Sequence, residues 1–283
     1  MSLKKKEALL IGIGKWGEVL ANILIKKGYR LSYVTRDKKP NFNFEIKFKS
    51  DFVRFFSCNI EMMFDLVVIA VKPKDFYDVW SEYKIYSKKF LLEKPGALNK
   101  SEIEKIFLEA SNEGRSVLVN YEYIYTKESQ LLLTKLIGKR NDIKEISIVW
   151  EKKLYSYGGL HWRLLPHLIA DLVTISQGNL SFTKSHVMKN SIKLIGKINN
   201  TNFKIEFNDK EKSFYQSKIE LDNKTIFIKE RNKLFLDDRL IYNKKNLSVD
   251  QMVDLIETAS KQIIISNNNL ATNVLSIIEE INV

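Results

Sequence analysis

The sequence predicts an α/β protein in two parts: a doubly wound parallel sheet over residues 1–120, then an α+β domain with an open, largely antiparallel sheet over residues 121–283. The first part alternates short apolar runs, typical of buried strands, with amphipathic stretches of helical spacing. The second carries, from His186 to Tyr242, at least five strand-like segments of polar alternation separated by NN, ND, DN and RN turns. The pattern changes near Asn120, where we place the domain boundary.

Short connections join the elements expected in the first part. In the last helix there, Ser101 and Glu104 match a capping box. Strand–helix alternation with such short connections requires parallel strands with helices on both faces of the sheet. Strands are predicted at residues 7–13, 30–35, 65–71, 90–93 and 116–120, helices at 15–27, 74–86 and 101–113, and one strand with a short helix within 42–56.

The second part is predicted to mix helices with the alternating strands. Because those strands are apolar on one face and polar on the other, we expect their sheet to be buried on one face only. A further strand is expected at residues 143–153, and helices at 126–137, within 156–176 after a glycine pair, at 252–262 and at 271–281.

Composition and charge exclude several classes of protein. Apolar residues make up 45% of the 283 residues and charged residues 28%, which indicates a globular chain. No apolar run approaches the ~18 residues needed to span a membrane, and no signal-peptide core is present. The single cysteine, Cys58, excludes a cysteine-rich metal site. The net charge of +12 comes from scattered lysines, so we expect no nucleic-acid partner. From the missing apolar run, the single cysteine and the missing signal-peptide core we expect no membrane partner, no metal and a cytoplasmic location.

The motif GIGKWG at residues 12–17 predicts a dinucleotide-binding turn of the Rossmann type. It follows a strand and opens a helix, which is the context the G-x-G-x-x-G pattern requires. Gly12 permits the tight turn, Gly14 lets the backbone approach the pyrophosphate, and Gly17 lets the helix pack closely on the strand. Lys15 and Trp16 lie inside this turn, at a helix N-terminus that favours phosphate. The alternative is an ordinary strand–helix turn.

The end of the second strand favours NADP(H) over NAD(H). An acidic residue at the position of Thr35 would accept hydrogen bonds from the ribose hydroxyls of NAD, and none stands there. Thr35 with Arg36 suits a 2′-phosphate, because a guanidinium binds phosphate bidentately. Asp37 comes two residues late and could still reach the ribose.

Three segments together resemble the Gfo/Idh/MocA oxidoreductases: GIGKWG, DLVVIAVKP at 65–73 and FLLEKPGALNKSEIEKI at 90–106. The resemblance continues more loosely through YGGLHWRLLPHLIAD at 157–171. It implies hydride transfer between a nicotinamide cofactor and a carbinol carbon of a sugar or polyol. It also implies a homodimer, or a dimer of dimers, formed through the open sheet of the second domain.

The triplet Glu93-Lys94-Pro95 is the most specific mark of this resemblance. It follows a buried strand, at the carboxyl edge where such sheets bind ligands. Lys94 can supply positive charge near a developing alkoxide, and the resemblance implies that it contacts the nicotinamide ribose and the reacting oxygen. Glu93 and Lys94 are expected in the cofactor site, and Pro73, after the fourth strand, near the nicotinamide or its ribose.

His167 is the candidate acid/base, because a histidine exchanges protons near neutral pH. The family pattern has a glycine pair, an aspartate about four residues before a histidine, and an acid just beyond. Gly158-Gly159 and His167 match, whereas Arg163 holds the aspartate position and opposes a protonated imidazole. Asp171, one helical turn further, is expected to orient His167. His161 is an alternative base.

The substrate side is predicted at Tyr121 and Tyr123, which follow the sixth strand, with Arg163 and Asp171. The substrate class is a sugar, polyol or nucleotide sugar. A catalytically inactive NAD(P)-binding regulator or sensor of the same fold is the alternative, favoured by Arg163. A glycosidase that uses transient oxidation is a third possible function.

Overall fold

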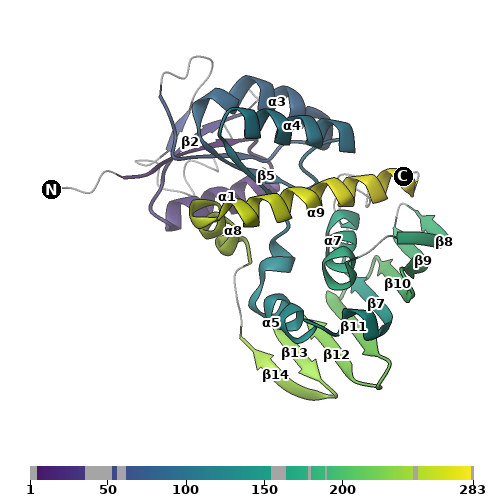
Figure 1. Ribbon diagram of the computed structural model, residues 1–283. Coiled ribbons are helices and arrows are strands. Elements are labelled where there is room, and N and C mark those ends of the chain that lie inside the picture. The colour runs from purple at the N-terminus through teal and green to yellow at the C-terminus, as the bar shows by residue number, and fades with distance from the viewer. Residues whose placement is uncertain are drawn as a thin grey trace. The chain divides into compact units, whose positions relative to one another are not determined.

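The chain folds into two compact units. The computed structural model describes residues 5–35, 53–55, 62–153, 164–177, 180–188, 190–244 and 248–281 (Figure 1). Residues 1–120 and 249–272 form the first unit, and residues 121–248 and 273–283 form the second. One boundary falls between Asn120 and Tyr121. Residues 249–272, which the sequence analysis assigned to the second domain, belong to the first unit.

The first unit contains a six-stranded sheet in which every neighbouring pair is parallel. The fold class predicted for this part is confirmed. In sheet order the strands are β3 (Val53–Phe55), β2 (Arg30–Val34), β1 (Glu7–Ile11), β4 (Leu66–Ile69), β5 (Lys89–Glu93) and β6 (Ser116–Asn120). The order reverses at β1 and β4, and open α/β sheets bind ligands at the carboxyl ends of the strands beside this reversal.

Helices cover both faces of this sheet. α3 and α4 lie on the face opposite α1 (Figure 1). β4 is buried along its whole length, which matches its unbroken apolar sequence. The helical elements of the unit are α1 (Lys15–Lys26), η2 (Pro73–Asp75), α3 (Phe76–Tyr83), η3 (Lys84–Tyr86), α4 (Lys100–Asn112), α8 (Ser248–Thr258) and part of α9 (Lys261–Glu280).

The cap of α4 is Asn99, and the predicted Ser101 capping box is wrong. The Asn99 side chain accepts a hydrogen bond of 2.8 Å from the backbone N–H of Glu102, and the Glu102 carboxylate accepts one of 3.1 Å from Leu98 N. Ser101 lies inside the first turn of the helix. Asparagine caps helices as well as serine does, so Asn99 can begin the helix two residues before Ser101.

α9 begins ten residues earlier than the predicted helix at 271–281, and its first half belongs to the first unit. Asn267 explains why this segment is held there. Its amide accepts a hydrogen bond of 2.7 Å from Val119 N and donates one of 3.0 Å to Val119 O. β6 is the edge strand of the sheet, so Asn267 satisfies backbone groups that no neighbouring strand can reach.

α8 is anchored to the same unit by Glu257. The Tyr29 hydroxyl donates a hydrogen bond to the Glu257 carboxylate, and Lys89 Nζ donates one of 2.8 Å to the Glu257 carbonyl. Lys6 pairs with the same carboxylate at 2.8 Å. These polar contacts with widely separated segments of the chain are the reason that residues 249–258 group with the first unit.

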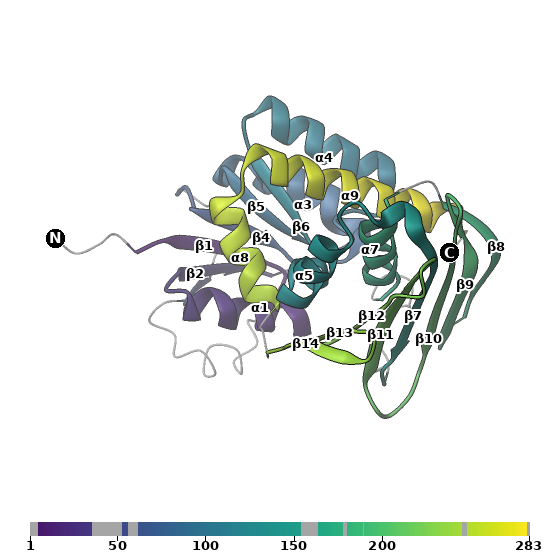
Figure 2. The same ribbon diagram turned by 60° about the horizontal axis from the view of Figure 1, so that its bottom comes forward.

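The second unit contains an eight-stranded open sheet, and the predicted class is again confirmed. All neighbouring pairs are antiparallel except β10 and β7, which are parallel. Figure 2 shows the strand order across this sheet, from β14 to β8. The strands are β14 (Arg239–Asn243), β13 (Lys233–Leu236), β12 (Ile226–Glu230), β11 (Phe214–Leu221), β7 (Ile143–Glu151), β10 (Thr201–Asn208), β9 (Ser191–Ile198) and β8 (Leu180–Val187).

One face of the second sheet is buried and the other is polar, as the alternation predicted. Ile146, Ile148 and Trp150 of β7 are buried, with α7 (Leu165–Ser176) packed on β7 and α5 (Lys127–Lys135) packed on β12 and β13. On the opposite face Lys193 and Lys204 pair with Glu206. The short helices η4 (Glu122–Tyr125) and η5 (Arg140–Asp142) complete the unit. No helix in the described part of the chain has the length and apolar character needed to cross a membrane.

Candidate functional site

Steric crowding makes two glycines of the β1–α1 turn obligatory. Gly12 has a φ of +94°, and a Cβ there would lie 2.4 Å from the carbonyl oxygen of Ala70. A Cβ on Gly17 would lie 2.3 Å from the carbonyl oxygen of Gly12. Real Cβ atoms do not approach so closely, so the turn can pass beside β4 and close onto α1 only with glycine at both positions. These are the tight-turn and helix-packing roles predicted for the two residues.

Gly14 has the opposite environment. No atom lies within 4 Å of the position its Cβ would take, and the residue is the N-cap of α1 without a side-chain cap. The space beside Gly14 and the amides of the first helical turn therefore suit a phosphate group. Lys15 and Trp16 begin the helix, and Trp16 is 40% exposed.

The carboxyl end of β2 is only partly described. Thr35 follows the strand and is half-buried. Arg36 and Asp37, which the choice between NADP and NAD depends on, lie outside the described residues. The preference for NADP therefore stays a prediction from the sequence.

The Glu93-Lys94-Pro95 triplet ends β5 with a buried carboxylate. Glu93 is 6% exposed and accepts a hydrogen bond from the Asn120 side-chain amide. Burial raises the pKa of Glu93, and the Asn120 bond, the charge of Lys94 and the nearby Trp16 indole only partly offset this effect. The triplet is thereby fixed to β6.

The backbone after the triplet is as crowded as that of the glycine turn. The Lys94–Pro95 peptide bond is cis, and Gly96 has a φ of +92°. A Cβ on Gly96 would lie 2.9 Å from both Ile103 and Val119. This close packing against α4 and β6 holds the segment that carries Lys94 at the carboxyl edge of the sheet.

Pro73 begins η2 after β4, also on the carboxyl side of the sheet. Tyr77, one turn further, is held away from a ligand role, because its hydroxyl donates a hydrogen bond of 3.0 Å to Glu109 of α4. The same carboxylate accepts from the Trp80 indole at 3.0 Å and from Lys84 at 2.9 Å. This cluster ties α3 to α4.

In the second unit, His167 is the third residue of α7 and is 8% exposed. Its Nε2 lies 3.8 Å from Glu122 Oε1, and the Tyr123 ring packs edge-on against the imidazole with a centroid distance of 4.7 Å. Glu122 is 2% exposed, so its charge acts on the imidazole with little screening by solvent. A carboxylate at this distance stabilises a protonated imidazole. The sequence analysis did not single out Glu122.

Asp171 does not orient His167, and that expectation is corrected. Its two carboxylate oxygens accept hydrogen bonds from Lys229 and from the Tyr215 hydroxyl. Asp171 and Lys229 are 3% and 2% exposed, so they form a buried ion pair. Burial, and then the charge and hydrogen bond of Asp171, raise the pKa of Tyr215 well above its ordinary value, so this hydroxyl stays protonated. Asp171 has no exposed oxygen to offer a substrate.

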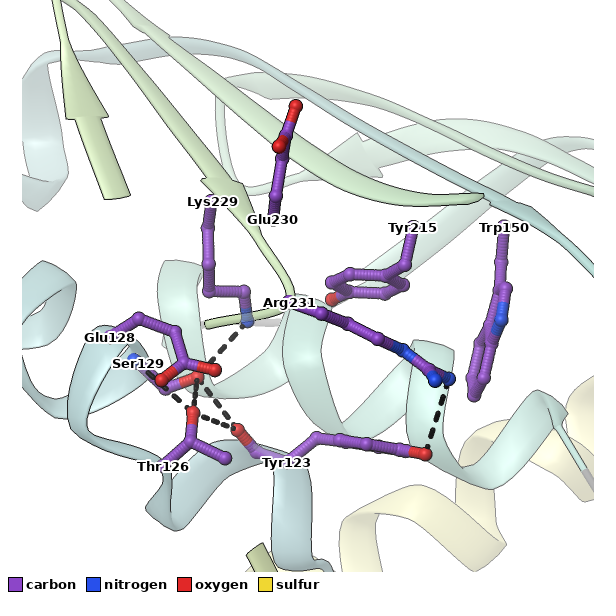
Figure 3. Close-up of a pocket in the computed structure, with 9 residues that line it drawn as sticks. All are labelled: Tyr123, Thr126, Glu128, Ser129, Trp150, Tyr215, Lys229, Glu230 and Arg231. Carbon is purple, nitrogen blue, oxygen red and sulfur yellow. Dashed lines mark hydrogen bonds between the residues drawn. The ribbon is translucent and has the colours of Figure 1, made fainter. Parts of the chain in front are cut away.

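A pocket opens beside this buried pair (Figure 3). It encloses about 260 Å³, counting space open to solvent. Its walls are three aromatic rings, two hydroxyl side chains and four charged side chains: Tyr123, Trp150, Tyr215, Thr126, Ser129, Glu128, Lys229, Glu230 and Arg231. Tyr123 and Trp150 also contact His167, so the pocket wall and the candidate acid/base share two rings.

The other residues predicted to bind the substrate lie in different surroundings. Tyr123 lies in the pocket wall. Tyr121 has no exposed surface, and its hydroxyl makes no hydrogen bond to any described residue, so its ring is part of the core. Arg163, His161 and the Gly158-Gly159 pair lie outside the described residues.

One signal for the pocket was present in the sequence. In the strand IFIKE, alternation places Lys229 on the same face as Phe227, and a lysine on an apolar face needs a buried partner. No local pattern pointed to Glu122 or Arg231, because their neighbours come from other elements. No group of three potential metal ligands occurs in the described part of the chain.

Fold and turn together define the class: a nucleotide-binding sheet of the Rossmann type joined to an open antiparallel sheet. A family model described as "NADP oxidoreductase coenzyme F420-dependent" matches residues 8–93, within the first unit. A search of curated protein sequences found no match.

Solved structures match the chain over nearly its whole length. A Gfo/Idh/MocA family oxidoreductase from Vibrio cholerae is 14% identical with a TM-score of 0.72, covering 98% of each chain. UDP-N-acetylglucosamine 3-dehydrogenase GnnA from Acidithiobacillus ferrooxidans is 11% identical with a TM-score of 0.79, covering 98% of this chain and 97% of that one. GenD2 from gentamicin A biosynthesis, solved with NAD, is 11% identical with a TM-score of 0.77, covering 99% and 93%. The resemblance predicted from the motifs is confirmed as a shared fold.

Proposed function

We propose that the protein is an NAD(P)-dependent oxidoreductase that transfers a hydride between nicotinamide and a carbinol or carbonyl carbon of a sugar, polyol or nucleotide sugar. One observation carries the proposal: the glycine turn leaves open space beside Gly14 at the N-terminus of α1, and Lys94 directly follows β5 of the same sheet. A turn suited to phosphate and a lysine suited to stabilise negative charge thus lie at the same carboxyl edge of one sheet. The dehydrogenases that share the fold support the proposal.

The residues at the turn fit a dinucleotide. Gly12 and Gly17 are crowded by protein backbone, whereas Gly14 faces open space beside a helix N-terminus. Gly12, Gly14, Lys15, Trp16 and Gly17 would hold the pyrophosphate, and Thr35 with Arg36 the adenosine ribose and its 2′-phosphate. When bound, the nicotinamide supplies the carbon that accepts or donates the hydride.

Lys94 and His167 are the two side chains that we propose take part in the reaction. The Lys94 ammonium stabilises negative charge that develops on the substrate oxygen. His167 exchanges the proton of that oxygen. Glu122, 3.8 Å from His167 Nε2, stabilises the imidazolium that forms when the ring takes up the proton.

We further propose that the protein is cytoplasmic and assembles as a homodimer, or a dimer of dimers, through the polar face of the second sheet. Val149 is half-buried at the middle of this face, on the central strand β7. Light scattering should give a dimer or tetramer for the native protein and a smaller species for Val149→Glu. A native monomer would contradict the assembly.

A non-catalytic NAD(P)-binding sensor is the second candidate, favoured by Arg163 at the position where the family pattern has an aspartate. The two candidates differ in whether the cofactor is consumed. A sensor would bind NADPH or NADH and change its affinity for a partner without altering the oxidation state of the cofactor.

The test of cofactor use is a fluorescence titration with NADPH and NADH. We expect saturable binding of both with tighter binding of NADPH, and Arg36→Ala should remove the difference. Saturable binding with no preference would overturn the NADP assignment alone. No binding of either would overturn the proposed function.

A further inference from the structure

Arg231 occupies an unusual position in the pocket of the second unit. It lies in the turn between β12 and β13, and Figure 3 shows its side chain reaching across the pocket. The guanidinium carbon lies 5.4 Å from the centroids of both the Tyr123 and the Trp150 rings. Its Nη2 donates one hydrogen bond, of 3.3 Å, to the Tyr123 hydroxyl. Toward the described residues, Arg231 makes two ring contacts and one hydrogen bond, which use few of its five donors.

Each of the other charged side chains that line the pocket has a partner, and one oxygen of Glu128 has none among the described residues. Lys229 is neutralised by Asp171 within the buried pair. Glu128 accepts a hydrogen bond of 3.1 Å from Asn232 N, and Glu230 is directed away from the other side chains and contacts Gln216 (Figure 3). In the part of the chain that the structure describes, no carboxylate lies within ion-pair distance of Arg231. Its positive charge is therefore available to a ligand.

The turn that carries Arg231 is held in place before any ligand arrives. Asn232 adopts a left-handed conformation with a φ of +66°, and Glu128 of α5 fixes its N–H. The rings of Tyr123 and Trp150 restrict the guanidinium, so little conformational entropy remains to be lost on binding. A planar guanidinium held in this way matches the geometry of a carboxylate or phosphoryl group, which accepts two parallel hydrogen bonds.

Tyr123 joins Arg231 to the candidate acid/base. Its hydroxyl accepts the hydrogen bond from Arg231, and its ring packs against His167. Both groups therefore border the same ring, which suits a sugar whose anionic substituent lies a few bonds from the reacting carbon.

We propose that Arg231 binds an anionic substituent, a carboxylate or a phosphoryl group, of the sugar substrate and so determines specificity for charged over neutral sugars. This inference rests on the proposed function, because it takes the ligand of the pocket to be a sugar. Glu128 acts as a positioning residue that holds the Arg231 turn.

The experiment uses three matched pairs of sugars that differ in the anionic group: glucuronate with glucose, glucose 6-phosphate with glucose, and UDP-N-acetylglucosamine with N-acetylglucosamine. Calorimetry with NADP⁺ present gives the dissociation constant of each sugar, and reduced-nicotinamide absorbance gives turnover. The first pair tests a carboxylate and the other two test phosphoryl groups. The variants are Arg231→Gln and, as a matched control, Arg239→Gln, an exposed arginine of β14 outside the pocket.

We expect at least one anionic sugar to bind more tightly than its neutral partner, and Arg231→Gln to weaken that binding by about tenfold or more. Binding of neutral sugars and of NADPH should not change, and Arg239→Gln should behave as the native protein. Glu128→Gln should weaken the anionic sugar less than Arg231→Gln does, because its amide oxygen can still accept from Asn232.

Three results would overturn the inference: no anionic sugar binds, Arg231→Gln weakens charged and neutral sugars equally, or Arg239→Gln has the same effect. Failure of the proposed function is a different outcome. In that case an anionic sugar binds in an Arg231-dependent manner and the nicotinamide is neither reduced nor oxidised.

Discussion

The indole of Trp16 lies beside the buried carboxylate of Glu93 and partly offsets the rise in its pKa that burial causes. Trp16 belongs to the glycine turn after β1, and Glu93 ends β5, two strands away in the sheet. This proximity brings the segment proposed to hold the pyrophosphate next to the segment that carries Lys94. Cofactor affinity and the position of Lys94 should therefore depend on each other.

Replacing Trp16 with phenylalanine tests this link. Trp16→Phe keeps an aromatic ring and removes the indole N–H beside Glu93, so we expect NADPH affinity and turnover to fall several-fold. Trp16 is 40% exposed, so thermal stability should change little. Trp80→Phe is the control, because it also removes an indole donor from a carboxylate, that of Glu109. Equal losses of NADPH affinity in both variants would contradict the link.

The three glycines of the turn should respond differently to alanine. Gly12→Ala combines a positive φ with a contact of 2.4 Å, so it should destabilise the protein by at least the ~1–3 kcal/mol of backbone strain. Gly17→Ala should also destabilise it, through the contact of 2.3 Å. Gly14→Ala should leave the urea midpoint unchanged and weaken NADPH, because its Cβ would enter the space proposed for phosphate. Unchanged NADPH binding in Gly14→Ala would contradict this placement of the cofactor.

The pKa of Glu93 predicts a pH dependence of stability. Burial raises its pKa in the folded protein above the ordinary value of about 4.3, so the folded state holds its proton to higher pH than the unfolded state. Stability is therefore lost as pH rises through the window between the two values. Glu93→Gln cannot ionise and should gain stability relative to the native protein across this window, measured by urea unfolding at several pH values.

Glu109→Gln is a control for which the expected pH dependence of stability is opposite to that of Glu93→Gln. Burial opposes ionisation of Glu109, but hydrogen bonds from Lys84, Trp80 and Tyr77 outweigh it and lower the pKa. The stability contributed by this carboxylate is present above its unfolded pKa and lost as pH falls through the folded value. The advantage of the native protein over Glu109→Gln should shrink in acid. The same pH trend in both variants would refute the assignment.

Removing only one partner of the buried Lys229–Asp171 pair should strongly destabilise the protein. Lys229→Met leaves the Asp171 carboxylate buried without its counter-ion, which costs about 3–5 kcal/mol. Adding Asp171→Asn removes that charge and keeps an acceptor for Tyr215, so the double variant should recover much of the loss. Lys210→Met, which breaks the exposed pair with Glu151, should have little effect. Urea unfolding measures all three, and equal losses in both single variants would contradict the buried pair.

The first sheet could be predicted from sequence because its signals are local. Each strand is a short apolar run, and each loop is marked by glycine, proline or a polar pair. β4 and β6 could be recognised in this way, and β6 was placed at its observed residues. GIGKWG also carried enough context to place the three glycines at a strand–helix junction.

The start of α9 could not be predicted, because Asn267 to Asn269 are poor helix formers. Two hydrogen bonds to Val119, a residue 148 positions earlier, stabilise Asn267 in the helix. Tertiary contacts of this kind override local propensity, and a single sequence does not reveal them.

The candidate site was predicted in part. Lys94 and His167 could be singled out by motif and chemistry. The partner of His167 could not, because helical spacing pointed to Asp171, whereas Glu122 on a separate short helix lies beside the ring and Lys229 engages Asp171. Spacing along a helix shows which residues share a face, and it does not show which other elements pack against that face.

Hydride transfer by the native protein and Lys94→Met, measured with NADPH and with NADH across a panel of keto-sugars, tests the central claim most directly. We expect the native protein to oxidise the cofactor with at least one sugar. Lys94→Met should lose at least about a hundredfold in kcat, with a smaller loss of cofactor affinity, because Lys94 is also expected in the cofactor site. Lys74→Met, an exposed lysine of η2, should behave as the native protein. No turnover with any sugar, or equal turnover by Lys94→Met, would contradict the account.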